Sequence, residues 1–247
     1  MTADVTAIVT CMTDGERPFL RETLKSVESQ TLPCETIVVV LETNTWIYDL
    51  AAEFPHMRMM RRPPGWEGAA RHTGVAAART EFVAFLDGDD VWCPTKTRKQ
   101  LHFLLNSGQD FVGVDHMLIT EEGTPFAYGL SRHLPMPSAW MVRRETMLRH
   151  PFDPNLAVGA DGEWWLSTWS TVRKHRLPEP LIKYRVRRQS QSHGTPNKRR
   201  KAALAGLSHW PVARPLLLAA TYLLHRLYRR IDYVPSKNWQ VSGRSRA

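Results

Sequence analysis

The feature that most constrains the fold of this chain is an apolar run that ends in a cluster of acids. Residues 82–86 (Phe-Val-Ala-Phe-Leu) are continuously apolar, and Asp87, Asp89 and Asp90 follow within four positions. A short run with aromatic and β-branched residues predicts a buried strand. Carboxylates held close together repel one another and resist desolvation, so this cluster needs a positive partner. A divalent cation is the expected partner because hard cations bind carboxylate oxygens.

Predicted strands and helices alternate along the first half of the chain. Strands are expected at residues 5–10, 36–41, 56–60 and 82–86, and helices at residues 17–30, 49–53, 65–79 and 94–105. This alternation predicts an α/β fold with a mostly parallel sheet and helices on both faces. Such sheets bind ligands beyond the carboxyl ends of their strands, where we expect Thr10, Glu42 and Asp87 to lie.

The second half of the chain is mixed rather than alternating. Strands are expected at residues 111–115, 117–120, 138–142 and 181–186, a helix at 143–149, and a loop leading into a Trp-rich helix at 159–169. This pattern predicts a smaller mixed region beside the parallel sheet.

The length of 247 residues predicts one large domain, or one domain with an appendage. We expect a catalytic domain over residues 1–192 and a basic, partly helical tail over residues 193–247. In the tail, a Lys-Arg-Arg-Lys run at 198–201 precedes an apolar segment at 216–224 that is followed by arginines. This segment could lie on an anionic membrane surface, or pack on the catalytic domain or on a second subunit. The sequence does not favour nucleic-acid binding, because no recognised nucleic-acid module accompanies the basic run.

The cysteines and the N-terminal sequence indicate the cellular compartment in which the protein is expected. Cys11, Cys34 and Cys93 lack the spacing of a metal site and do not form a disulfide framework, which favours a reducing compartment. The N-terminus lacks the pattern of a signal peptide, and no apolar run approaches the roughly 20 residues of a spanning helix. We therefore expect a cytoplasmic protein, with the tail as a candidate for peripheral contact with the cytoplasmic face of the membrane. The net charge of +9 suits phosphate-bearing or other anionic partners, although a solvated basic surface is the simpler interpretation.

The acidic cluster does not fit a calcium loop. Counted from Asp87, an EF-hand would need Gly at the position of Trp92 and Glu at the position of Arg98. Two carboxylates at the end of a strand instead suit Mg²⁺ or Mn²⁺ held against a diphosphate. A solvated acidic turn that caps the following helix is the alternative interpretation.

Five segments, in order, resemble motifs of the family 2 glycosyltransferases. The resemblance begins with the apolar strand and helix of the opening region and continues with Ala-Arg-His-Thr-Gly, similar to Ala-Arg-Asn-x-Gly. The stretch that ends in Asp-Gly-Asp-Asp-Val-Trp resembles the Asp-x-Asp motif. A later segment resembles the Glu-Asp motif, and the last resembles the strand that closes the catalytic domain. The matching residues are 8–41, 70–74, 82–92, 152–161 and 180–186.

The resemblance covers residues 5 to about 192 and implies a GT-A fold, which is Rossmann-like. It also implies an enzyme of the hexosyltransferase type that transfers a sugar, with inversion, from a nucleotide-diphosphate sugar to an acceptor hydroxyl. The expected donor is a UDP-sugar, and the expected cofactor is Mn²⁺ or Mg²⁺. The acceptor could be a glycan, a lipid-linked molecule or a small molecule.

Residue roles follow from the resemblance, position by position. Thr10 matches a position beside the nucleotide base, and Arg71 matches an arginine near the nucleotide. Asp87 matches the first acid of the Asp-x-Asp motif, near the ribose and the metal, and Asp89 matches the main metal ligand. Asp161 matches the general base that would take the proton of the acceptor. The alternatives are a helix N-cap for Asp161 and a structural partner of the acidic cluster for Arg71.

The chain also departs from the family pattern. Glu42 is the candidate replacement for the aspartate that binds the base after the second strand. His72 replaces the usual Asn, and Ala160 replaces the usual Glu before the base. Trp164 and Trp165 could stack on a sugar or pack in the core. A nucleotidyltransferase-like enzyme and a non-catalytic nucleotide-sugar-binding relative remain as alternative hypotheses.

Overall fold

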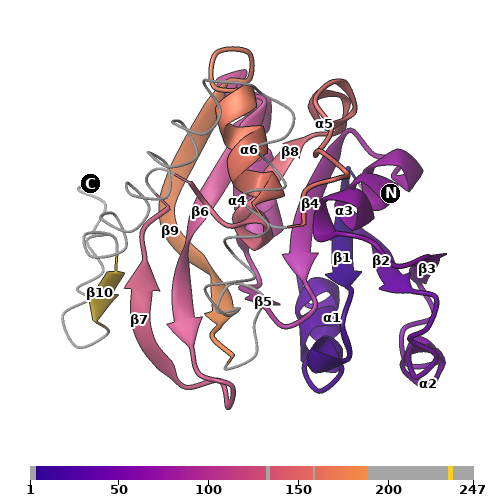
Figure 1. Ribbon diagram of the computed structural model, residues 1–247. Coiled ribbons are helices and arrows are strands. Elements are labelled where there is room, and N and C mark those ends of the chain that lie inside the picture. The colour runs from indigo at the N-terminus through magenta and orange to yellow at the C-terminus, as the bar shows by residue number, and fades with distance from the viewer. Residues whose placement is uncertain (1–3, 132–133, 158, 188–232, 236–247) are drawn as a thin grey trace.

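A computed structural model describes residues 4–131, 134–157 and 159–187, and the backbone of residues 233–235. It is an α/β structure built around one ten-stranded sheet (Figure 1). Apart from residues 233–235, the expected C-terminal tail, with its segments 198–201 and 216–224, lies outside the described residues. Within the described part of the chain, no helix combines the length and the apolar character that crossing a membrane requires.

The first half of the chain forms the parallel part of the sheet. Four parallel strands lie side by side in the order β3-β2-β1-β4. They are β1 (Val5–Cys11), β2 (Glu35–Leu41), β3 (Met57–Arg62) and β4 (Phe82–Asp87). The 3₁₀ turn η1 (Asp14–Glu16) and the helices α1 (Leu20–Glu28), α2 (Ile47–Ala51) and α3 (Glu67–Ala77) connect these strands. The expected alternation and parallel order are confirmed.

The second half adds a mixed region. Strand β6 (Phe111–Ile119) pairs antiparallel with β7 (Pro125–Gly129) and β8 (Met141–Arg143), and parallel with β9 (Lys174–Arg185). Strand β8 joins this region to β4, β5 (Val91–Trp92) pairs with β9, and β10 (Tyr233–Pro235) pairs with β7. The remaining elements are α4 (Lys96–Ser107), η2 (Pro137–Ala139), α5 (Arg144–Arg149) and α6 (Ala160–Ser167).

Several boundaries differ from those expected. The two strands predicted at 111–115 and 117–120 are one strand, β6, and the sequence did not predict β5 or β7. Strand β9 begins at Lys174 rather than at 181. The predicted strand at 138–142 begins instead with the 3₁₀ turn η2.

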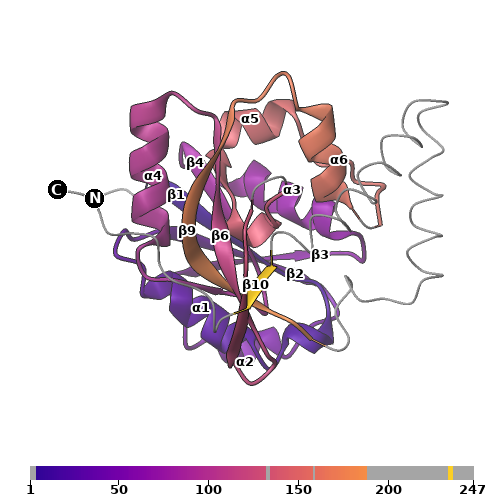
Figure 2. The ribbon, with the colours of Figure 1, turned by 90° about the vertical axis from the view of Figure 1, so that its left-hand side faces the viewer.

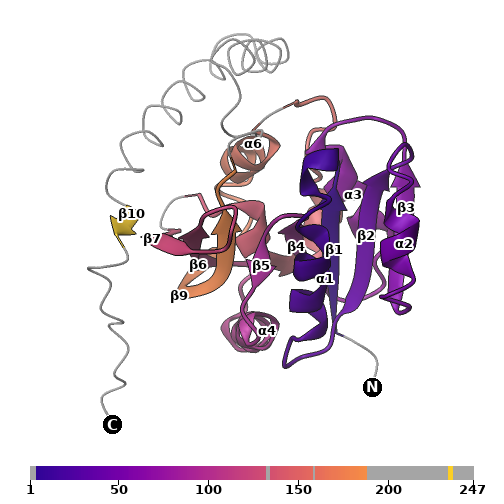
Figure 3. The ribbon, with the colours of Figure 1, turned by 90° about the horizontal axis from the view of Figure 1, so that it is seen from below.

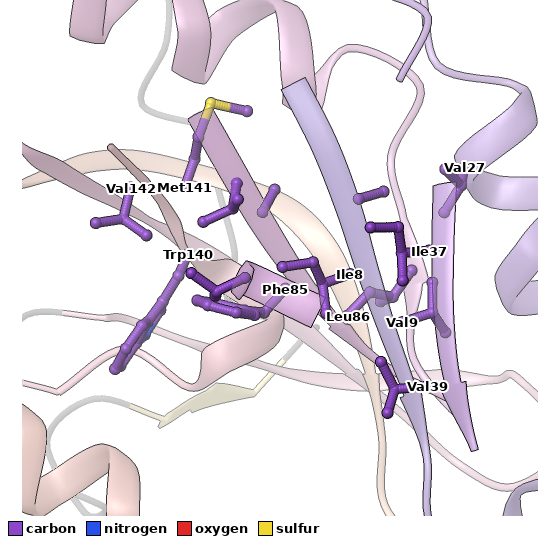
Figure 4. Packing of buried hydrophobic residues seen from close by; sticks show 14 of the residues in the cluster. Ile8, Val9, Val27, Ile37, Val39, Phe85, Leu86, Trp140, Met141 and Val142 are labelled. Atoms are coloured by element: carbon purple, nitrogen blue, oxygen red, sulfur yellow. The ribbon is translucent and has the colours of Figure 1, made fainter. Parts of the chain in front are cut away.

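Helices cover both faces of the sheet, as the alternating pattern predicted. Helices α3 and α6 lie on one face and α4 on the other (Figures 2 and 3). Between them, apolar side chains of β1, β2, β4 and β8 fill the core, including Ile8, Ile37, Phe85 and Met141 (Figure 4). These strands are buried on both faces, which explains their continuous apolar sequences.

The small residues of α3 allow it to lie close to the sheet. A Cβ on Gly74 would lie 2.3 Å from Cγ2 of Ile8 in β1. Only glycine fits at this position without displacing its neighbours. Helix α3 therefore packs directly on β1 at this position.

Candidate active site

The acidic turn follows β4 at the carboxyl edge of the parallel strands. Asp87 and Asp89 line a cavity of about 330 Å³, whereas Asp90 is fully buried and does not line it. A side chain between the two lining acids would be crowded, because a Cβ on Gly88 would lie 3.1 Å from the carbonyl oxygen of Thr10 and 3.3 Å from Cβ of Glu16. The turn therefore presents two of its three acids to the cavity.

Segments far apart in the sequence contribute to the cavity. Its lining comes from η1, the start of α3, the acidic turn, the loop before η2, the start of α6 and the end of β9. The lining residues are Thr13, Gly15, Glu16, Glu67, Gly68, Arg71, Asp87, Asp89, Met136, Pro137, Leu156, Ala157, Gly159, Ala160, Asp161, Tyr184 and Arg187. Among the described residues, five carboxyl groups thus share the cavity with two guanidinium groups.

Thr10 and Arg71 both hold Asp87. Thr10 lies opposite Asp87 in the register of β1 with β4, and its hydroxyl donates to Oδ1 of Asp87 at 3.2 Å. Arg71 donates to the same oxygen at 2.7 Å and to Glu67, one helical turn earlier, at 3.2 Å. Burial lowers the pKa of Arg71, but Asp87 and Glu67 outweigh it and raise that pKa above its ordinary value. Arg71 is therefore a charged partner of the acidic cluster, and it also lines the cavity.

Arg187, two residues beyond β9, is the partner of Asp89. Its Nε donates to Oδ2 of Asp89 at 2.5 Å, and its Nη1 donates to the carbonyl oxygen of Gly15 at 2.9 Å. Burial raises the pKa of Asp89, and the guanidinium of Arg187 opposes that effect. The sequence did not predict this residue, because 98 positions separate the two partners.

Asp161 enters the cavity from the first turn of α6. The N-cap of this helix is Gly159, in the left-handed conformation, so Asp161 is not the cap. Within the described residues its carboxylate makes no hydrogen bond or ion pair, and the positive end of the helix dipole favours its charge. Helix α3 lies so close to α6 that a Cβ on Gly68 would be 3.1 Å from Cβ of Ala160. The small side chain of Ala160 thus has a packing role where the family pattern has Glu.

Glu16 is a further acid of the cavity that the sequence did not predict. Its side chain is buried and accepts the backbone N–H of Thr13 at 2.8 Å. Burial raises the pKa of Glu16 to about 8, opposed by the Thr13 N–H and assisted by Asp89. The spacing of Thr13 and Glu16 matches a capping box, which predicts the turn but not its position against Gly88.

Two expected contributors lie elsewhere. Glu42 is exposed just beyond β2 and is not among the residues that line the cavity.

Trp164 is buried among aromatic side chains, 5.0 Å from Trp140 and 5.9 Å from Phe111 between ring centroids. Its indole donates to the carbonyl oxygen of His150 at 2.6 Å. For Trp164 the core-packing interpretation is confirmed.

The cavity could hold a divalent cation only with help from a ligand. Within the described residues, no three His, Cys, Asp or Glu side chains converge closely enough to hold a metal. In the part of the chain that the structure describes, the side-chain hydrogen bonds of Asp87 use Oδ1 and those of Asp89 use Oδ2, so each carboxylate has one further oxygen that could bind a cation. Mg²⁺ and similar ions commonly take one or two carboxylates and complete their coordination with phosphate oxygens and water. The donor set therefore fits a metal that binds together with a diphosphate.

Comparison with known proteins identifies the class and then the family. The fold is shared with TarS of S. aureus, solved in complex with UDP-GlcNAc: the TM-score is 0.66 at 16% identity, over 87% of this chain and 69% of that one. The model of "Glycosyl transferase family 2" matches residues 6–169. The chain belongs to glycosyl transferase family 2, and the GT-A-type α/β fold expected from the resemblance is confirmed.

Relatives found by sequence comparison include proteins that are named as glycosyltransferases. An uncharacterised glycosyltransferase of Methanocaldococcus jannaschii is 23% identical over 75% of this chain and 72% of its own length. TuaG of Bacillus subtilis, named as a glycosyltransferase of teichuronic acid biosynthesis, is 28% identical over 44% of this chain. The succinoglycan biosynthesis protein ExoW of Rhizobium meliloti is 39% identical over 32% of this chain. The aligned regions span 46% of TuaG and 27% of ExoW.

Proposed function

We propose that this chain transfers a sugar from a nucleoside-diphosphate sugar to an acceptor hydroxyl, with inversion and with the help of a divalent metal. One observation carries the proposal: Asp87, Asp89 and Asp161 line one cavity although they come from distant segments of the chain. Family membership supports sugar transfer, and the structures of TarS with UDP-GlcNAc and with UDP support a UDP-sugar as donor.

The charges of the cavity favour a metal. Glu16 is protonated at neutral pH because its pKa is about 8, but the other four carboxyl groups still outnumber the two guanidinium groups, so a diphosphate would enter a site rich in acids. Asp87 and Asp89 would hold Mn²⁺ or Mg²⁺ through their available oxygens. When bound, the metal would neutralise the charge that develops on the departing nucleoside diphosphate.

Asp161 would act as the general base. It would take the proton of the acceptor hydroxyl while the acceptor oxygen forms its bond to the anomeric carbon of the sugar. In the same displacement the bond from that carbon to the phosphate oxygen breaks, and the nucleoside diphosphate leaves with the bonding electrons. One displacement inverts the anomeric configuration. Arg71 and Arg187 would keep Asp87 and Asp89 in place until the donor binds.

A thermal-shift panel tests this proposal. Nucleoside diphosphates are added with and without Mn²⁺, and a ligand that binds only the folded state raises the midpoint of unfolding by an amount that grows with the ratio of its concentration to its dissociation constant. We expect UDP with Mn²⁺ to stabilise the protein more than either one alone. If no nucleoside diphosphate stabilises it with or without Mn²⁺, the proposal is wrong.

A further inference from the structure

The third acid of the turn, Asp90, is the only one that does not line the cavity. Its side chain is fully buried, and both of its carboxylate oxygens accept hydrogen bonds from distant segments. Oδ2 accepts the hydroxyl of Ser138, in η2, at 2.6 Å, and Oδ1 accepts the backbone N–H of Arg185, in β9, at 2.9 Å. Both oxygens are occupied inside the protein, so Asp90 is not placed to bind a ligand in the cavity.

The hydroxyl of Ser138 connects the two ends of the acidic turn. It donates to Asp90 and also accepts the backbone N–H of Asp87 at 3.1 Å. The turn closes on itself through a hydrogen bond from the N–H of Asp90 to the carbonyl oxygen of Asp87 at 3.0 Å. One buried hydroxyl group thus fixes Asp87 relative to Asp90, with Asp89 between them.

The backbone carbonyls of the turn are held as well. The hydroxyl of Thr23, in α1, donates to the carbonyl oxygen of Gly88 at 3.1 Å and to that of Asp90 at 2.8 Å. The guanidinium of buried Arg185 donates to the carbonyl oxygen of Asp89 at 3.0 Å. Contacts from α1, η2 and β9 therefore restrain every residue of the turn.

From these contacts we infer that Asp90 and Ser138 are positioning residues, which set the spacing of the Asp87 and Asp89 carboxylates for a divalent cation. This inference rests on the proposed function for its metal. The physical reason is that two carboxylates bind one cation well only if their oxygens are already held in place. Partners that orient metal ligands commonly account for a 10–100-fold difference in metal affinity.

The chain contains a matched control. The hydroxyl of Ser26, in α1, donates to the carbonyl oxygen of Thr23 at 2.6 Å and accepts the backbone N–H of Trp92 at 3.1 Å. Ser26 is also buried, and its two bonds have the same lengths as those of Ser138. Ser138→Ala and Ser26→Ala therefore each remove one donated and one accepted hydrogen bond of the same lengths, but only Ser138 contacts the acidic residues of the turn.

The experiment measures two quantities in wild type, Ser138→Ala and Ser26→Ala. The first is amide hydrogen exchange in the segment 87–90, which does not depend on any ligand. The second is the Mn²⁺ concentration that raises the unfolding midpoint of each protein by the same fixed increment in saturating UDP, because that concentration scales with the dissociation constant. For Ser138→Ala we expect faster exchange in this segment and an Mn²⁺ requirement raised about tenfold or more. For Ser26→Ala we expect an Mn²⁺ requirement close to that of wild type.

A third variant changes the acid itself. Asp90→Asn, which keeps the shape of Asp90 and disturbs its hydrogen bonds, is expected to behave like Ser138→Ala.

The possible failures are distinguishable. If wild type responds to Mn²⁺ and Ser138→Ala needs no more Mn²⁺ than Ser26→Ala does, the inference is wrong and the proposed function stands. If wild type shows no stabilisation by UDP with Mn²⁺, the proposed function is wrong, and so is the part of the inference that concerns the metal. Unchanged exchange in Ser138→Ala would contradict the positioning role in either case.

Discussion

The guanidinium of Arg187 lies 2.5 Å from a carboxylate oxygen of Asp89, so a residue just beyond β9 neutralises the acid proposed as the main metal ligand. Both side chains are only 11% exposed. A charge that is this far buried is costly once its partner is removed. The ion pair therefore links the segment after β9 to the acid proposed as the metal ligand.

Replacing Arg187 tests this link. We expect Arg187→Met to lower the free energy of unfolding by about 1–3 kcal/mol without ligand, because Asp89 loses its counter-ion. Mn²⁺ should then stabilise this variant more than it stabilises wild type, since a cation can replace the guanidinium. Chemical denaturation with and without Mn²⁺ measures both effects.

The control for Arg187 is Arg21, whose ion pair with Glu53 is 58% and 43% exposed. Arg21→Met should change stability by no more than about 0.5 kcal/mol, because exposed pairs contribute little. Equal losses in the two variants would mean that Asp89 does not depend on Arg187.

Gly74 tests the close contact between α3 and the sheet. We expect Gly74→Ala to destabilise the protein by about 1–3 kcal/mol, because its Cβ would lie 2.3 Å from Ile8 and force β1 and α3 apart. Gly162, also in a helix, is the control: a Cβ there would meet Leu134 at an ordinary 3.7 Å. Gly162→Ala should be neutral or stabilising by up to about 1 kcal/mol. Similar urea midpoints for the two variants would contradict the packing role of Gly74.

Lys96 gives a prediction about pH. Its side chain is fully buried 4.1 Å from the ring of Trp92, and burial lowers the pKa of Lys96 to about 7. An unfolded lysine has a pKa of about 10.4, so between these values the unfolded chain binds a proton that the folded chain does not. The free energy of unfolding should therefore rise with pH across this interval.

The comparison of wild type with Lys96→Met isolates this effect. Cys34 and Cys93 also face Lys96, and burial raises the pKa of each thiol, to about 11 for Cys34. Thiols of the unfolded chain begin to ionise within the measured range of pH 7.0–8.5, but both proteins contain them, so their contribution cancels in the difference between wild type and the variant. Over that range, the stability of wild type relative to the variant should rise by about 1–2 kcal/mol. Parallel pH profiles would mean that Lys96 keeps an ordinary pKa.

The sequence predicted the parallel part of the fold well because its physical causes are local. Strands buried on both faces have continuous apolar sequences, and the register of β1 with β4 then brings Thr10 beside Asp87. Strand β9 was harder to predict because Pro178 and Pro180 interrupt it, where its register with β6 shifts. Strand β7 begins with Pro and ends with Gly, which obscures its pattern.

The predicted site residues were those that lie in recognisable motifs. The structure brings Thr10, Arg71, Asp87, Asp89 and Asp161 into or beside one cavity and leaves Glu42 outside its lining. Glu67 was accessible to sequence reasoning, since it lies four residues before Arg71 on the same helix. Glu16, Ser138 and Arg187 were not, because only tertiary contacts bring them to the acidic turn.

Asp161 is the residue through which the proposed reaction is tested most directly. The measurement is the rate of UDP release, with Mn²⁺, from the UDP-sugar that wild type consumes fastest, with water as acceptor and UDP affinity determined in parallel. We predict that Asp161→Asn slows release by about 10²–10⁴-fold and leaves UDP affinity nearly unchanged, because only proton transfer is lost. Glu163→Gln, in the same helix but outside the cavity lining, should release UDP as wild type does. Release by Asp161→Asn at a rate near that of wild type would contradict the role of Asp161 as the base.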